Sequence, residues 1–205
     1  MRYEEMLPHQ IDAVLKEKPI AYLPWGALEW HGRHLAIGND ALKAHALCLE
    51  AAKRSGGVVL PPVWCGFHTL GLGGFTHTLE FSEDLVRQLT AEYLTQLDKN
   101  GFKVIVVVTG HYGASHVKAL REVAERVGRR TKATIWVLPE YELTMEDIGY
   151  RGDHAGKWET SLLMHLRPEL VDMSQQPSDP DVKLEGVGGE DPRFHASAEL
   201  GKQTA

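Results

Sequence analysis

Residues 104–113 read VIVVVTGHYG, and this stretch decides the fold. Its first five residues are all apolar and β-branched, with no polar residue at alternate positions. Such a run is typical of a central strand in a parallel sheet, which is buried on both faces. His111 follows the strand between Gly110 and Gly113, where glycine lets the backbone turn sharply. We therefore predict a buried strand that ends in a histidine available for function.

Three further apolar runs predict strands at residues 19–23, 57–60 and 133–138. Helical patterns lie between the strands. One covers residues 40–54. A second begins after Ser82, a good N-cap, and ends at Asn100-Gly101. A third carries an apolar stripe that runs from Val117 to Val127. This alternation predicts an α/β fold, a three-layer α-β-α sandwich with a mainly parallel sheet.

The predicted helix after Ser82 has apolar residues at four-residue spacing, which predicts its buried face. These residues are Leu85, Leu89, Tyr93 and Leu97.

The length of 205 residues fits one domain, spanning residues 1–205, with a substantial core. Residues 172–193 are rich in Pro, Gly, Asp and Gln, which predicts a long irregular segment. Residues 197–205 begin a helical pattern that stops early, so we expect an abbreviated C-terminal helix.

The formal charge of −6 gives no electrostatic reason to expect a nucleic acid or an anionic membrane as partner. No apolar run approaches the ~18 residues of a membrane span. Cys48 and Cys65 are too few for a disulfide framework, which favours a reducing cytoplasm.

Polar and titratable residues that could form a site follow several of the predicted strands. Glu29 and His31 come after the first strand, His111 after the third, and Glu140 and Tyr141 after the fourth. Because ligands in open α/β sheets bind beyond the carboxyl ends of the strands, these positions predict one site at one edge.

Glu29 and His31 are two residues apart, so in an extended segment both side chains point to the same side. Asp40 opens the predicted helix 40–54. In isolation it is better explained as a capping residue, but a carboxylate can also bridge two ions. With His111 and Glu159, these residues supply three carboxylates and two imidazoles, a ligand set suited to one or two divalent metals.

Residues 153–161 read DHAGKWETS and combine a loop with the start of a helix. Glu159 could reach back to the cluster, and His154 could exchange a proton with a leaving group. The alternative is that Glu159 is a first-turn helix charge and His154 a cap. Trp158 and Trp30 could wall the pocket, or could be plain core residues.

Together these segments resemble the creatininase, or creatinine amidohydrolase, family. Residues 24–35 are similar to its opening motif P-x-G-S-x-E-Q-H-G-P-H-L, and residues 38–40 to its G-T-D. The family's later motifs are matched in order by residues 75–82, 109–113, 153–161 and 186–201.

The resemblance implies a divalent-metal-dependent amidohydrolase that cleaves a non-peptide or cyclic amide C–N bond through a metal-bound hydroxide. The metal would be one or two ions of Zn²⁺, Mn²⁺ or Fe²⁺. The implied metal ligands are Glu29, His31, Asp40 and His111, with Asp40 bridging, together with Glu159. Glu159 takes the role of a family glutamate whose position is Gly113 in this sequence.

The resemblance also implies that His154 is the proton donor and that Tyr112 contacts a small-molecule substrate. We expect Asp153 to orient His154. Tyr150 and Arg151 replace the Trp-Asp pair that grips creatinine in that branch of the family. The metal ligands of the family are therefore kept, while the substrate contacts differ. Creatinine is not the expected substrate. We expect Tyr150 and Trp158 to contact a different substrate.

Two other interpretations stay open. One is a catalytically silent ligand-binding or assembly protein that keeps the fold. The other, within the enzyme class, is a formamide deformylase or a peptide-trimming amidase. The resemblance further implies a homo-oligomer, ring-like or hexameric.

Overall fold

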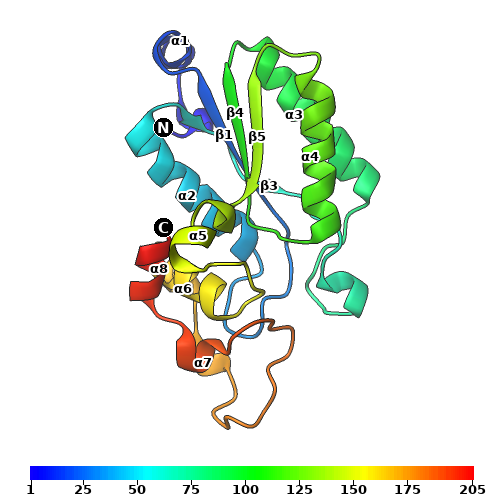
Figure 1. Cartoon of the computed structure of the whole chain (residues 1–205), viewed down its shortest axis with the longest axis vertical. Helices are drawn as coiled ribbons and strands as arrows, with labels where there is room; N and C mark the ends of the chain where they lie inside the picture. Colours follow the sequence, from blue (N-terminus) through cyan, green and yellow to red (C-terminus); the bar gives the residue numbers. More distant parts are fainter.

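A parallel sheet organises the computed structural model, which describes the backbone of residues 1–205 and all side chains except those of residues 143, 145 and 146 (Figure 1). The strands are β1 (Ile20–Gly26), β2 (Val58–Val59), β3 (Val63–Trp64), β4 (Val104–Thr109) and β5 (Thr134–Pro139). They lie in the order β2-β1-β4-β5, β3 pairs with the end of β1, and every pairing is parallel. The four predicted strands are confirmed, with β3 as an addition.

Helices cover both faces of the sheet. The α-helices are α1 (Pro8–Glu17), α2 (Asn39–Ser55), α3 (Glu83–Lys99), α4 (Ala114–Gly128), α5 (Met145–Ile148), α6 (Lys157–Leu166), α7 (Pro192–His195) and α8 (Ala198–Thr204). Short 3₁₀ turns occupy Tyr3–Glu5, Leu70–Gly73, Glu140–Leu143, Pro168–Leu170 and Met173–Gln175. In Figure 1, α3 and α4 lie on one side of the strands and α2 on the other. This arrangement confirms the predicted α/β sandwich.

The apolar clusters on the two faces of the sheet follow from the alternation of side chains along the strands. Leu23 of β1 and Val107 of β4 belong to the larger cluster, on the side of α3 and α4. Their neighbours Tyr22 and Val108 belong to a smaller cluster, which includes Ala44 of α2. Because β4 is apolar from Val104 to Val108, it can be buried from both sides.

The predicted buried face of α3 is confirmed for Leu89, Tyr93 and Leu97, which pack in or against the core, but not for Leu85. Leu85 is 44% exposed, whereas Val86, Thr90, Leu94 and Leu97 are buried. The buried set is spaced four, four and three residues apart, which follows the 3.6-residue helical period more closely than a strict four-residue spacing. The helix boundaries were as expected, since the Ser82 hydroxyl caps α3 by accepting from the Leu85 amide.

The C-terminal part of the chain packs through α8. Helix α8 lies against α6, where a Cβ at Gly201 would come within 1.9 Å of the Ser161 carbonyl oxygen. Between the two helices, residues 172–193 contain little regular structure. The assignment of residues 1–205 to a single domain stays a prediction.

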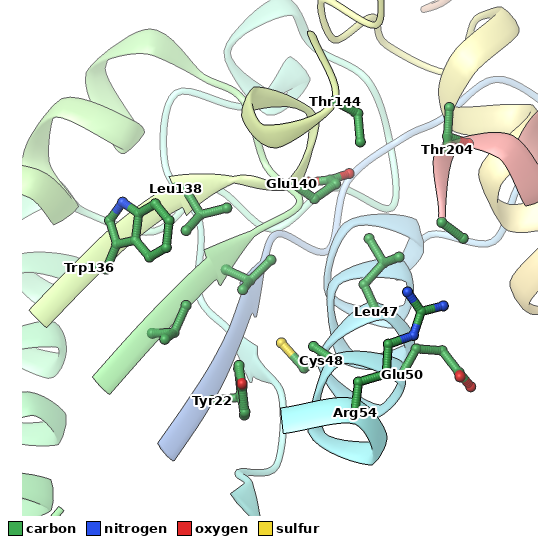
Figure 2. Close-up of a pocket in the computed structure, with 14 residues that line it drawn as sticks. Tyr22, Leu47, Cys48, Glu50, Arg54, Trp136, Leu138, Glu140, Thr144 and Thr204 are labelled. Carbon is green, nitrogen blue, oxygen red and sulfur yellow. The ribbon is translucent and has the colours of Figure 1, made fainter. Parts of the chain in front are cut away.

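An apolar groove of about 400 Å³ runs along the α2 side of the sheet, next to β4 and β5. Figure 2 shows Tyr22, Cys48 and Leu138 on its walls and Glu140 at the end of β5. Trp136 in this groove is 53% exposed. None of the described helices is long and apolar enough to cross a membrane.

Candidate metal centre

Two glycines let the first turn of α2 approach the carboxyl ends of β1 and β4. A Cβ at Gly26 would lie 2.3 Å from the Ala41 amide nitrogen, and one at Gly110 would lie 2.1 Å from the Asp40 carbonyl oxygen. Side chains are therefore excluded at both positions. This close approach carries Asp40 between Glu29 and His31, which follow β1, and His111, which follows β4.

A substitution at Gly110 should therefore destabilise the protein. We expect Gly110→Ala to lower the free energy of unfolding by about 1–3 kcal/mol, because the added methyl group overlaps the α2 backbone. Gly128→Ala at the end of α4 is the matched control, since nothing lies within 4 Å of its added Cβ. Urea unfolding of both variants measures the difference, and equal stabilities would contradict the prediction.

The first group of side chains consists of Glu29, Asp40 and His111. His111 Nδ1 lies 3.0 Å from Glu29 Oε2 and 3.4 Å from Asp40 Oδ2. All three side chains are buried, and their ligand atoms lie within 4.8 Å of one another, a spacing that could hold a metal ion. The Leu70 amide fixes Glu29 by donating to its Oε1 at 2.8 Å.

The second group consists of His31, Asp40 and Glu159. His31 Nε2 lies 2.9 Å from Asp40 Oδ1 and 3.4 Å from Glu159 Oε2. These side chains are also buried and could hold an ion in the same way. Asp40 thus gives one oxygen to each group. The structure brings together all five residues predicted as metal ligands, while their role as ligands stays a prediction.

The hydrogen bonds of the two histidines show why a cation fits between them and the carboxylates. His31 Nδ1 lies 3.0 Å from the Glu29 carbonyl oxygen, and His111 Nε2 lies 3.0 Å from the Phe67 carbonyl oxygen. A carbonyl only accepts, so each of these nitrogens carries the proton. In the neutral ring, the other nitrogen then turns its lone pair toward carboxylate oxygens, which is repulsive unless a positive charge lies between.

Two buried atoms support this interpretation. His31 Nε2 and Glu29 Oε2 have no hydrogen-bond partner of acceptable geometry among the described residues. Buried polar atoms are rarely left unpaired, because desolvation without a partner costs free energy. The donor atoms present, two imidazole nitrogens and three carboxylates, are those that Zn²⁺ and Mn²⁺ accept in proteins.

Without a metal, protons can take the place of the cation. Burial alone disfavours a charged His111, but hydrogen bonds and charge from Asp40 and Glu29 outweigh it and raise the pKa of His111 to about 10. The pKa of His31 is also raised, because Asp40 and Glu159 overcome the effect of burial. The pKa of Glu159 is lowered to about 2, since burial is outweighed by the charges of Lys43 and His31.

The stability of the metal-free protein should therefore fall with pH. A histidine whose pKa is raised from 6.5 to about 10 stabilises the fold fully below pH 6.5, and this contribution is lost as the pH rises toward 10. Between pH 7 and 8.5 we expect a loss of about 1.4 kcal/mol per pH unit from His111. Urea unfolding with a chelator measures it. His111→Gln should flatten the slope, and an unchanged slope in that variant would contradict the assignment.

The cleft in front of these groups has a volume of about 400 Å³. Its lining includes four of the five predicted ligands, Tyr112, Asp153 and His154, and also His68, Thr69, Leu70 and Leu72 from the loop after β3. That loop therefore forms part of the wall of the cleft.

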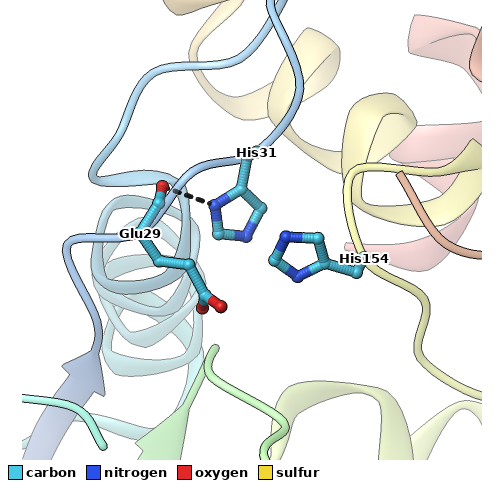
Figure 3. A group of neighbouring side chains, drawn as sticks. All are labelled: Glu29, His31 and His154. Carbon is cyan, nitrogen blue, oxygen red and sulfur yellow. Dashed lines mark hydrogen bonds between the residues drawn. The ribbon is translucent and has the colours of Figure 1, made fainter. Parts of the chain in front are cut away.

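His154 lies beside the second group. Its ring stacks on the His31 ring with centroids 4.2 Å apart, and Figure 3 shows His31 between Glu29 and His154. His154 Nε2 donates to the Trp30 carbonyl oxygen at 2.8 Å, so Nδ1 carries the lone pair. Burial, followed by the charge of His31, lowers the pKa of His154 below its ordinary 6.5. The ring is therefore neutral at pH 7.

The prediction that Asp153 orients His154 is wrong. The two Asp153 oxygens accept from the backbone amides of Trp158 at 2.8 Å and Glu159 at 3.1 Å. Among the described side chains, no hydrogen bond joins Asp153 to His154. Asp153 instead caps the first turn of α6, where free amides and the helix dipole favour a carboxylate. It thereby holds Glu159 in place.

The predicted substrate contacts are met only in part. Tyr112 lines the cleft, but its hydroxyl bonds Tyr150 at 2.7 Å and also contacts Lys43 and Glu140 behind the cleft. The structure does not bring Tyr150 and Trp158 to the cleft. Tyr150 is buried behind Tyr112, and its ring stacks on Trp158 with centroids 5.2 Å apart. Of these three residues, Tyr112 is the one that borders the cleft, and its contact with a substrate stays a prediction.

Sequence reasoning missed Lys43, whose side chain is fully buried behind the second group. Its ammonium pairs with Glu140 at 2.8 Å and with Glu159 at shorter range. Its position could have indicated this role. Lys43 follows Asp40 by three residues in the predicted helix 40–54, and residues three apart share a helix face. Glu140 was placed at the correct strand end but given no role.

Curated relatives align with about three quarters of this chain. A creatinine amidohydrolase from Pseudomonas putida is 27% identical over 175 residues, 76% of this chain and 67% of that protein. A mycofactocin precursor peptide peptidase from Mycolicibacterium smegmatis is 29% identical over 165 residues, 75% of this chain and 60% of that protein. The chain thus spans about two thirds of the length of these relatives.

A solved structure of the manganese form of creatininase has the same fold. It superimposes with a TM-score of 0.83 at 22% identity, over 98% of this chain and 91% of that one. Residues 4–204 match the model of the creatininase family, described as creatinine amidohydrolase. The chain therefore belongs to the creatininase family.

Proposed function

We propose that this chain hydrolyses an amide C–N bond with the help of two divalent cations. Glu29, Asp40 and His111 would hold one cation, and His31, Asp40 and Glu159 the other. One observation carries the proposal: two histidines each direct one ring nitrogen at a backbone carbonyl and the other at one of the two oxygens of a single buried aspartate. Membership of an amidohydrolase family supports the same chemistry.

Zn²⁺ and Mn²⁺, or Fe²⁺, are the metals that we propose, because imidazole and carboxylate donors suit all three. When bound, such ions supply a Lewis acid that polarises a carbonyl and acidifies water near neutral pH. The similar creatininase structure in its manganese form supports this choice.

The residues of the chain position the substrate and move a proton. His154 lines the cleft, and its Nδ1 has no hydrogen-bond partner among the described residues. Since this nitrogen is unprotonated at pH 7, His154 would first accept a proton from the attacking water and then deliver it to the leaving nitrogen. Proton donation by His154, the role predicted from the sequence, would thus be the second of its two proton transfers.

The substrate that we propose is a small non-peptide or cyclic amide other than creatinine. The cleft volume of about 400 Å³ suits a small molecule. Leu70, Leu72 and Tyr112 add apolar surface to the lining of the cleft.

A peptide-trimming amidase is the second candidate. The observation that favours it is the similarity to a peptide peptidase, whose identity of 29% is slightly higher than the 27% identity to the creatinine amidohydrolase. The metal groups are compatible with both substrates, because both reactions break an amide bond.

A substrate screen of metal-loaded protein tests these proposals. Zn²⁺- and Mn²⁺-loaded samples would be assayed with cyclic amides, formamides, creatinine and short peptides, with His154→Gln as a control. Turnover of a small amide, lost in His154→Gln, supports the first candidate, and turnover of peptides alone supports the second. Full metal occupancy without any turnover would favour the catalytically silent alternative. Chelator-free protein that binds no stoichiometric metal would overturn the metal-dependent scheme.

Assembly into a homo-oligomer, with a hexamer as the specific expectation, and a cytoplasmic location are further proposals. Both are based on the sequence. Size-exclusion chromatography with light scattering tests the first, and a monomer at micromolar concentration would contradict it.

A further inference from the structure

A single buried ammonium group stands behind the two metal groups. Lys43 Nζ donates to the Gly110 carbonyl oxygen and to the Tyr112 hydroxyl, each at 2.8 Å. It also pairs with Glu140 and Glu159, and its side chain is fully buried. Lysine is almost never fully buried unless it is paired. The two carboxylates and the two neutral oxygens around Nζ supply the partners that allow this ammonium group to be buried.

The ammonium keeps its charge. Burial disfavours the charged form, but the charges of Glu140 and Glu159 outweigh it and raise the pKa of Lys43 above its usual range. Glu140 belongs to the apolar groove on its other side, so this ion pair separates the groove from the metal cluster.

The contacts of Glu159 divide its two oxygens between different partners. Oε1 binds Lys43. Oε2 accepts from the Ala155 amide at 2.7 Å and lies 3.4 Å from His31 Nε2. With Oε1 held by Lys43, Glu159 can offer only Oε2 toward His31 and Asp40.

We propose that Lys43 is a positioning residue that fixes Glu159 as a single-oxygen donor to the cation held by His31, Asp40 and Glu159. This inference rests on the proposed two-cation function. It is specific for one of the two positions, because the Lys43 ammonium contacts Glu159 but neither Glu29 nor the His111 ring.

The test must separate positioning from plain stability. Lys43→Met alone leaves Glu140 and Glu159 buried without their cation, which can unfold the protein. The double variant Lys43→Met/Glu140→Leu removes both members of the pair, and the apolar groove beside residue 140 can accept the leucine. Glu140→Gln is the matched control, since it keeps Lys43 and its contact with Glu159.

Binding of Mn²⁺ alone provides the readout, by equilibrium dialysis and by electron paramagnetic resonance. In the wild-type protein and in Glu140→Gln we expect two ions with a spin-coupled spectrum. In the double variant we expect the first ion to bind within about threefold of wild type and the second about 10–100-fold more weakly. At one matched Mn²⁺ concentration, the coupled spectrum should give way to that of isolated ions.

Two results would overturn the inference. In one, the double variant binds its second ion with wild-type affinity. In the other, both ions are weakened equally, which would indicate a general structural effect. A wild-type chain that binds fewer than two ions would instead overturn the proposed function, so the two failures are distinguishable.

Discussion

Asp40→Asn should abolish binding of the second divalent ion and weaken the first. Asp40 Oδ1 lies 2.9 Å from His31 Nε2 and Oδ2 lies 3.4 Å from His111 Nδ1, so one side chain serves both groups. Asparagine has the same shape but is neutral and offers one oxygen where aspartate offers two. If catalysis needs both ions, kcat/KM should fall by at least about 10³-fold.

Metal analysis of Asp40→Asn and a rate assay on the substrate found by screening measure this effect. Glu50→Gln is the matched control, because Glu50 lies on the same helix but borders the apolar groove instead of the cleft. The control should keep two ions and wild-type rates. Two tightly bound ions in Asp40→Asn would refute the shared role of this carboxylate.

The sequence allowed much of this site to be foreseen because the sheet is parallel. The carboxyl ends of parallel strands lie at one edge, so residues that follow β1 and β4 must be neighbours, whatever loop each occupies. The Gly110-His111 pair identified the end of β4, and Asp40 was close to Glu29 and His31 in sequence. These features are local, and simple patterns reveal them.

The features of the site that were not predicted correctly depend on how α6 packs, and no local sequence pattern specifies that packing. An aspartate beside a histidine suggested a catalytic pair, but the free amides at the start of α6 bind the Asp153 carboxylate. Tyr150 and Trp158 were expected in the cleft, yet their rings stack behind Tyr112. Helix α1, in which Val14 is the sole buried residue, was not predicted.

The dependence on long-range packing also explains why the role of Lys43 was not predicted. The side chain of a lysine in an amphipathic helix normally extends into solvent. Burial of the Lys43 ammonium is favourable only because Glu140, after β5, and Glu159 of α6 pair with it. Those partners lie 97 and 116 residues further along the chain, as their numbers show. Long-range pairing of this kind becomes visible only in the folded structure.

His154→Gln should lower kcat by about 10²–10⁴-fold while leaving both ions bound. His154 stacks on His31, but its hydrogen bond goes to the Trp30 carbonyl oxygen, so its removal leaves the metal groups with all their carboxylates. Glutamine can replace the hydrogen bond to that carbonyl, but it cannot carry a proton between water and the leaving nitrogen.

The pH profile distinguishes this role from simple packing. The unprotonated form of His154 is the active one, and burial lowers the pKa of His154 below 6.5, so wild-type kcat should fall only in acid below that value. In His154→Gln the acid limb due to this group should disappear together with most of the rate. His195→Gln, at an exposed position in α7, should change neither quantity. An acid limb that persists unchanged in His154→Gln would assign the proton transfer to another group, and the shuttle would then have to run through a different side chain of the cleft.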